Sequence, residues 1–230
     1  MRKLAIAMVL ASTALAGPAI ARDKAWYIGV EGGAMIVEDM SYKLRGTNTE
    51  AMRVDSATGF DVDGIIGYDF GMFRLEAEVG YKRSEADKLR NSVPFGGTAI
   101  GSYDATVSGR TSALSFMVNG LLDFGQDDGI SGYVGGGVGV ARIKAVAITV
   151  FPRTVIEDSD TGFAYQAIAG VRFPITTNID LGLKYRFFNA EGVNVTARNG
   201  VGLDTRYRSH SLLASLVYNF GEPAAPPPPP

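Results

Sequence analysis

Three features of this 230-residue chain predict an all-β protein, an eight-stranded antiparallel up-and-down transmembrane β-barrel. Apolar and polar residues alternate with a period of two, which is typical of strands with two different faces. The eight alternating segments are joined by connections that are in turn long and short, as in membrane barrels. After the N-terminal region no apolar run approaches the about 20 residues of a spanning helix. A chain of this kind enters a membrane as a closed barrel, because an open sheet edge would leave backbone groups unpaired in lipid.

Residues 1–21 form a predicted secretory signal peptide. The segment begins with the cations Arg2 and Lys3, continues with an apolar run over residues 4–15, and ends in small residues up to Ala21. The apolar run is shorter than a spanning helix requires, which argues against a membrane anchor. We therefore expect the protein to leave the cytoplasm.

The composition excludes several classes of protein. The formal charge is −2, and a surface that binds nucleic acid would need clustered cations, so we expect no nucleic-acid partner. Without cysteine there is no disulfide framework and no thiolate site. The length suits one all-β domain, which we place at residues 22–221, followed by a proline-rich tail or truncated linker at residues 222–230.

The clearest structural signal is a β-hairpin within residues 59–82. Apolar residues occupy even positions before Gly71 and odd positions after it, and only a tight turn separates the two runs. In a soluble sandwich the apolar face would be a core, whereas in an outer-membrane barrel it meets lipid and the other face lines the lumen. The rest of the chain favours the barrel. The other face carries Asp61, Asp63, Asp69, Arg74, Glu76, Glu78 and Lys82.

Six more segments complete the eight predicted strands. One precedes the hairpin, with Glu31 opposite its apolar face, and five follow it: residues 25–37, 106–124, 130–143, 162–173, 179–188 and a last strand that ends at Phe220. Short turns alternate with four long polar segments that we expect to be loops, at residues 38–57, 84–105, 144–160 and 189–205. Because eight strands enclose a narrow interior, small and polar side chains are expected inside.

Several features, taken together, resemble the outer membrane protein A family. They are the signal peptide, the up-and-down order of strands, the segment Phe163-Ala164-Tyr165-Gln166-Ala167, the ending Tyr218-Asn219-Phe220 and the proline-rich tail. The resemblance covers the transmembrane domain, about residues 26–220. It implies a place in the outer membrane of a Gram-negative-type envelope, in contact with outer-membrane lipid. It also implies that the barrel-assembly machinery reads the terminal aromatics Tyr218 and Phe220, although an ordinary aromatic girdle explains them equally well. The family's peptidoglycan-binding domain is not seen here, so peptidoglycan contact is not expected.

Charges on the inward face predict ion pairs in the lumen, because a buried charge without a partner costs several kcal/mol. The acids are Glu31, Asp61, Asp63, Glu76 and Glu78, and the cations are Arg74, Lys82, Lys184 and Arg186. Members of the resembled family similarly hold charged clusters inside the barrel. We expect these residues to form a structural plug, and the alternative is a gate in a small pore.

No catalytic, cofactor or metal site is predicted. The only histidine, His210, is flanked by Ser209 and Ser211, whose side chains point away from it in a strand. The glycine-rich residues 135–139 are not followed by the helix that a phosphate site needs. The acidic residues 157–160 could bind calcium, but a solvated acidic loop is the simpler explanation.

The sequence therefore predicts a non-enzymatic barrel that stabilises the outer membrane and presents loops outside. Exposed loops on a rigid scaffold are where recognition usually lies. A low-conductance channel and a surface adhesin with an extracellular ligand remain the alternatives.

Overall fold

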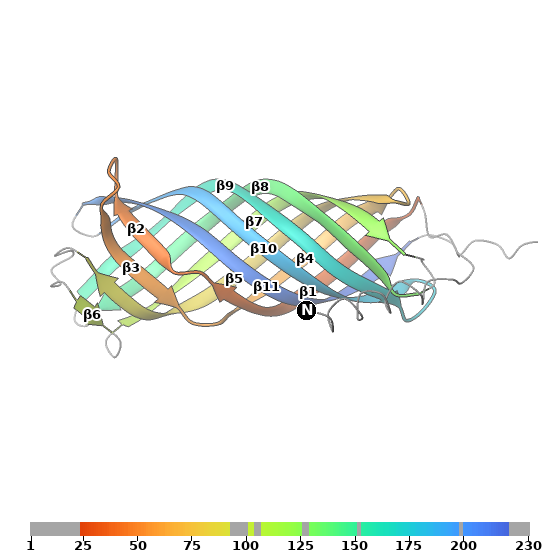
Figure 1. Cartoon of the computed structure of the whole chain (residues 1–230), viewed down its shortest axis with the longest axis horizontal. Helices are drawn as coiled ribbons and strands as arrows, with labels where there is room; N and C mark the ends of the chain where they lie inside the picture. The colour runs from red at the N-terminus through yellow and green to blue at the C-terminus, as the bar shows by residue number, and fades with distance from the viewer. Residues whose placement is uncertain are drawn as a thin grey trace, which may run out of the picture.

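The computed structural model describes residues 24–92, 101–103, 107–125, 129–150, 153–197 and 200–220. In this part of the chain eleven antiparallel strands form one sheet (Figure 1). None of the described residues forms a helix that is long and apolar enough to cross a membrane. The predicted signal peptide and proline-rich tail lie outside the described residues. The strands are β1 (Trp26–Val37), β2 (Met40–Leu44), β3 (Glu50–Ser56), β4 (Gly59–Asp69), β5 (Phe73–Asn91), β6 (Gly101–Tyr103), β7 (Val107–Phe124), β8 (Ser131–Val150), β9 (Arg153–Pro174), β10 (Ile179–Thr196) and β11 (Gly202–Asn219).

The sheet closes into a ring of eight strands, β1-β4-β5-β7-β8-β9-β10-β11, which confirms the predicted antiparallel up-and-down architecture. The first and last strands pair from Tyr27 opposite Asn219 to Val37 opposite Ser209. At one end the short hairpin of β2 and β3 takes the place of β1 and β4 between β11 and β5. The ring therefore keeps eight strands where this exchange occurs, up to the last pairing of β5 with β7, at Glu85 and Arg110.

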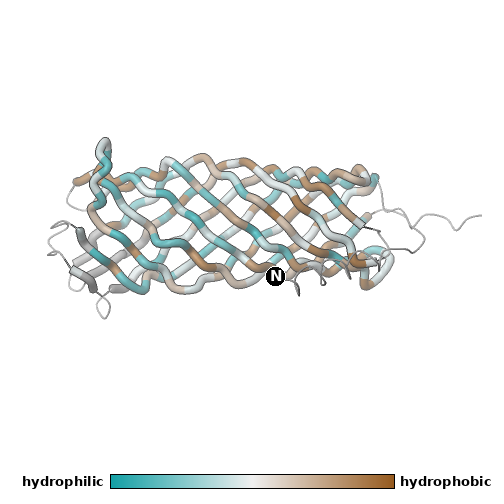
Figure 2. Tube along the Cα trace, in the orientation of Figure 1, coloured by the Kyte–Doolittle hydropathy of each residue, from teal (hydrophilic) through white to brown (hydrophobic). Residues whose placement is uncertain are grey.

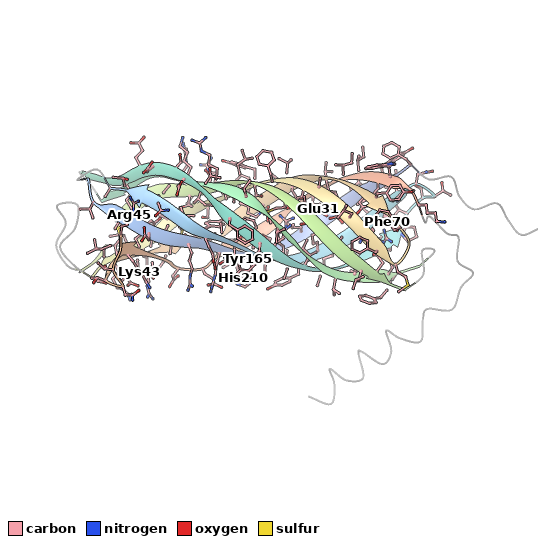
Figure 3. All side chains as sticks on the ribbon, turned by 90° about the horizontal axis from the view of Figure 1, so that it is seen from above. Glu31, Lys43, Arg45, Phe70, Tyr165 and His210 are labelled. Atoms are coloured by element: carbon pink, nitrogen blue, oxygen red, sulfur yellow. The ribbon has the colours of Figure 1, made fainter. Side chains whose placement is uncertain are left out.

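The two ends of the barrel differ. At one end lie tight turns, such as the one at Gly71, which has a positive φ of 105°. The first and last strands also meet there, since the backbone N–H of Phe220 donates to the carbonyl of Trp26 over 2.9 Å. We call this the turn end; Phe70 marks it in Figure 3, and Lys43 and Arg45 mark the opposite end.

Outward side chains make an apolar belt around the half of the barrel next to the turn end. Aromatic pairs border it: Trp26 packs edge-on against Tyr68 at the turn end, and Phe60 lies against Tyr81 at the other border. Valine, leucine and isoleucine side chains between these borders are about half exposed, which suits contact with lipid. Figure 2 shows the brown, hydrophobic positions alternating with teal ones along these strands.

Beyond the belt the strands continue far into the segments that the sequence analysis assigned to four long loops, so that assignment was wrong. β9 has 22 residues and β8 has 20, whereas about 9–11 are enough to cross a bilayer. We call this part the outer extension; it comprises β2, β3 and residues 84–91, 144–150, 153–162, 189–196 and 202–208. Where its side chains are described, the period of two persists, but the polarity of the two faces is reversed.

The interior of the outer extension is mostly apolar, with Ser84 and Thr205 among its few buried polar residues, which corrects the expectation of small and polar residues throughout the lumen. Outside the membrane the outer face meets water, so the inner face becomes a core as in a soluble barrel. In β2, for example, Met40 and Tyr42 are buried while Lys43 is exposed. This apolar section also includes inward residues from the adjoining part of the barrel. It consists of Met35, Val37, Met40, Tyr42, Ala51, Met52, Val54, Leu89, Ala113, Met117, Ala141, Ile143, Ala145, Ile156, Ala164, Phe188, Ala190, Val193, Val195, Ala197, Leu203 and Tyr207.

Candidate functional site

The candidate site is the lumen inside the apolar belt, where charged and amide side chains are buried. Strand alternation turns its residues inward, and the register sets pairs of them side by side. Glu31 on β1 lies opposite Asp63 on β4, and Asp61 on β4 lies opposite Lys82 on β5. Lys184 and Arg186 enter from β10. With Glu78 of β5 these residues form what we call the central cluster: Glu31, Asp61, Asp63, Glu78, Lys82, Lys184 and Arg186.

Arg186 is the centre of this cluster, and its side chain is fully buried. Its Nη1 lies 3.3 Å from Asp61 Oδ2 and 3.3 Å from Glu78 Oε1. Its Nη2 lies 2.5 Å from Asp63 Oδ2 and 3.3 Å from Glu31 Oε2. One guanidinium thus joins carboxylates from three strands, since its planar fork carries several donors.

The two lysines complete the pairing. Lys184 Nζ lies 2.5 Å from Glu31 Oε2, and Lys82 Nζ lies 3.3 Å from Asp61 Oδ1. Asp61 also accepts a hydrogen bond from the hydroxyl of Ser211 at 2.7 Å. Each of these groups is removed from water, so the attraction between opposite charges is little screened.

Amide side chains extend the cluster across the lumen. Glu78 Oε2 accepts hydrogen bonds from Asn119 Nδ2 at 2.9 Å and from Gln166 Nε2 at 3.0 Å. Gln166 also donates to Asn119 Oδ1 at 2.7 Å. Glu78 of β5 therefore connects Asn119 of β7 and Gln166 of β9 to the network that Arg186 forms with β1 and β4.

Arg74 and Glu76 lie in a second cluster, nearer the turn end. Arg74 binds Asp123 with two nitrogens, at 2.7 and 2.9 Å, and its Nη1 lies 3.5 Å from Glu76 Oε1. The Tyr27 hydroxyl donates to Glu76 at 2.9 Å. The guanidinium also lies over the rings of Tyr27 and Tyr133, with 5.6 and 4.8 Å to the centroids. This layer lies between the central cluster and the turn at Gly71.

On its outer side the central cluster meets the apolar section. Lys82 Nζ lies 4.5 Å from the centroid of the Phe188 ring, and this ring packs edge-on against Tyr207. Along the barrel axis the lumen thus holds an arginine-aromatic layer, then the central cluster, then a hydrophobic core. The sequence analysis proposed the charged members as site residues but did not include their partners Asn119 and Gln166 among them.

The only histidine lies on the outer wall, near the border between the belt and the outer extension (Figure 3). Its Nδ1 is 2.9 Å from the Tyr185 hydroxyl and its Nε2 is 3.1 Å from Glu38 Oε1. The hydrogen bond to His210 lowers the pKa of Glu38. Ser209 and Ser211 are buried on the opposite face of the strand, so they form no serine-histidine pair with His210.

The acidic residues 157–160 are part of β9 rather than of a loop. Asp158 accepts a hydrogen bond from the backbone N–H of Thr196, and Asp160 accepts one from that of Asn194, both at 2.8 Å. These carboxylates join β9 to β10, and the bond from Asn194 lowers the pKa of Asp160. Within the described ranges no group of three or more acidic, histidine or cysteine side chains could hold a metal ion.

The terminal aromatics lie on the outward face beside the turns. Tyr218 and Phe220 are 44% and 57% exposed, and their rings pack edge-on with centroids 5.1 Å apart. They belong to the girdle at the turn end, and a role in assembly stays a prediction.

A closed antiparallel ring with an apolar belt, aromatic borders and a charged lumen defines a transmembrane β-barrel of the outer-membrane type. Comparison with known families agrees: the chain belongs to the family described as "Outer membrane protein beta-barrel domain", whose profile matches residues 5–220. Membership indicates a location in the outer membrane.

The chain is similar to three further proteins. The chain is 25% identical to outer membrane protein PagN of Salmonella typhimurium, over 75% of this chain and 78% of that protein. It is 26% identical to outer membrane protein A of Shigella flexneri, over 97% of this chain and 57% of that protein. It is also 25% identical to a Rickettsia prowazekii protein named "Putative adhesin RP828", over 86% of this chain and 89% of that one. The resemblance to the outer membrane protein A family is thus confirmed.

Two solved structures share the fold. The chain matches outer membrane protein OprG of Pseudomonas aeruginosa with a TM-score of 0.53 and 11% identity, over 87% of this chain and 98% of that one. It matches Neisserial surface protein A with a TM-score of 0.51 and 17% identity, over 85% of this chain and 97% of that one. At this identity the matches speak for the fold alone.

Proposed function

We propose that this protein is a structural barrel of the outer membrane, with a lumen closed to ions by its own side chains. The single observation that carries the proposal is the environment of Arg186, whose buried guanidinium contacts four carboxylates in the middle of the barrel. An ion that entered this layer would have to displace a charge-assisted contact at each step.

The apolar section supports the same proposal independently. A conducting lumen needs a continuous polar path, but Phe188, Tyr207 and their buried neighbours occupy the barrel directly outside the charged layer. An ion there would lose its hydration without gaining a partner, which costs many kcal/mol. Movement or removal of the lysine and arginine side chains alone would therefore not open a pore.

Channel recordings of a double variant distinguish the plug from the gate. The variant Lys184→Gln/Arg186→Gln removes two of the three cations of the central cluster. In planar bilayers we expect it to remain as silent as the parent protein, because the apolar section still fills the lumen. Steady, discrete openings of the variant would contradict the plug and support a gated channel.

Adhesion is the second candidate function. It is favoured by the outer extension, which carries charged side chains such as Lys43 and Arg53 beyond the membrane, and by the rickettsial relative's name. Replacing the β2–β3 turn, residues 45–49, with a glycine-serine linker should lower attachment of expressing bacteria to host cells. The same replacement at the turn after Pro174 is the control, since that turn lies at the opposite end. Equal attachment by both variants would contradict adhesion through this turn.

The fold and the family support the remaining parts of the proposal. We infer contact with outer-membrane lipid through the belt, insertion by the barrel-assembly machinery, and no catalytic step. Binding to peptidoglycan or nucleic acid is not part of the proposed function.

A further inference from the structure

A group of cations lies on the outer wall immediately beyond the apolar belt. Arg83 of β5, Arg110 of β7, and Arg142 and Lys144 of β8 all point outward from three neighbouring strands. With Ser112, Tyr81 and Leu114 they line a groove of about 460 Å³. We call it the wall groove. It lies outside the barrel and shares no residue with the lumen.

The strand register arranges the wall groove in rows that run around the barrel. Tyr81, Leu114 and Arg142 form one row, because Tyr81 pairs with Leu114 and Leu114 pairs with Arg142. The next row, one step away from the membrane, contains Arg83, Ser112 and Lys144. Arg110 follows in the row beyond. The groove thus changes from apolar to cationic within two rows.

The cations are poorly neutralised by the protein itself. Arg83 Nη2 lies 3.8 Å from Glu85 Oε1, and both side chains are exposed, at 36% and 72%. Arg142 donates to the hydroxyl of Ser159, at 3.1 Å, and forms no ion pair with any carboxylate that the structure describes. Among the described residues no carboxylate forms an ion pair with Arg110 or Lys144. Four cations next to one solvated acid leave a site that attracts anions.

We propose that the wall groove binds the phosphate groups of a phosphorylated glycolipid of the outer leaflet. Arginine and lysine are suited to phosphate oxygens, arginine through its planar fork. Tyr81 and Leu114 at the floor of the groove belong to the edge of the belt, so the ligand has apolar chains directly below its anionic group. The outer extension faces outward, as the longer end of such barrels does, which selects the outer leaflet.

The alternative ligand is a soluble polyanion, such as a sulfated polysaccharide. It would need cations but no adjacent apolar belt, and the exposed tip of the outer extension offers cations such as Lys43 and Arg45 as well. The position of the wall groove at the water-lipid border favours the lipid. The proposal does not depend on whether the lumen conducts.

The test is a binding titration on the folded full chain in neutral detergent. The probes are a bis-phosphorylated glycolipid, the same lipid without its phosphates, and a soluble heparin fragment. The variant Arg142→Gln/Lys144→Gln is compared with Lys43→Gln/Arg45→Gln, which makes the same change of charge at the far tip. Circular dichroism and mobility on unheated gels establish that each variant is folded; Arg110→Gln replaces the first variant if it is not.

Each basic residue near an anionic surface contributes about fivefold to affinity, so we expect about twenty-five-fold weaker binding of the phosphorylated lipid by the Arg142/Lys144 variant. The tip variant should stay within about twofold of the parent. Equal binding of the dephosphorylated lipid, equal losses in both variants, or tighter binding of heparin than of the lipid would each overturn the proposal.

Discussion

Replacement of Arg186 by glutamine tests how much the central cluster stabilises the barrel. The side chain is fully buried and contacts Glu31, Asp61, Asp63 and Glu78. Without it these four carboxylates share only the two lysines. Removing one partner of a buried ion pair costs about 3–5 kcal/mol, because the remaining charge stays uncompensated. We expect Arg186→Gln to lower the free energy of unfolding by at least this amount.

The assay is urea unfolding of the full chain refolded into lipid vesicles. Trp26 is the only tryptophan and is 57% exposed on the lipid side, so its fluorescence reports insertion of the belt. The control is Arg83→Gln, which loses an exposed pair worth about 0.5 kcal/mol. Adding Asp63→Asn to Arg186→Gln should recover part of the loss, since it removes an uncompensated charge. A loss below about 1 kcal/mol for Arg186→Gln would refute the reasoning.

Three further predictions concern the outer extension and the turn end. Asp160→Ala removes a link between β9 and β10. The pKa of Asp160 in the folded protein lies below its ordinary value of 3.8, so the carboxylate stabilises the fold at neutral pH and this stabilisation is lost as the pH falls through the folded pKa. Urea unfolding of variant and parent should therefore converge in acid. Phe188→Ala opens a cavity in the apolar section and should cost about 3–5 kcal/mol in the same unfolding assay, and a loss below 1 kcal/mol would show that the section is loosely packed. Replacing Tyr218 and Phe220 with alanine should lower the amount of folded protein in cells while spontaneous refolding into vesicles stays unchanged; equal yields in cells would remove the assembly role.

The sequence was sufficient to predict the ring of strands and the inward position of the charged residues. Alternation alone puts Glu76 and Glu78 on one face and Leu75 and Ala77 on the other. It does not reveal which charges meet. Arg186 contacts residues of β1, β4 and β5, and these contacts depend on the tilt and stagger of the closed barrel, which the pattern of one strand does not contain.

The outer extension was missed for a physical reason. The sequence analysis expected apolar residues outward and polar residues inward, as lipid requires. In β2 and β3 the same period of two has the opposite sense, with Met40, Met52 and Val54 buried and Lys43 exposed. A change of solvent from lipid to water reverses the pattern without interrupting the strand. Searching for the period without fixing its polarity would have found these strands.

Conductance of the full chain tests the central claim most directly. The protein is refolded into a planar bilayer, and insertion is verified by the protection of the barrel from added protease. A lumen closed by the Arg74 layer, the central cluster and the apolar section should carry no steady current at either polarity. Discrete, reproducible openings of the folded parent protein would contradict the closed lumen and replace the structural barrel with a channel.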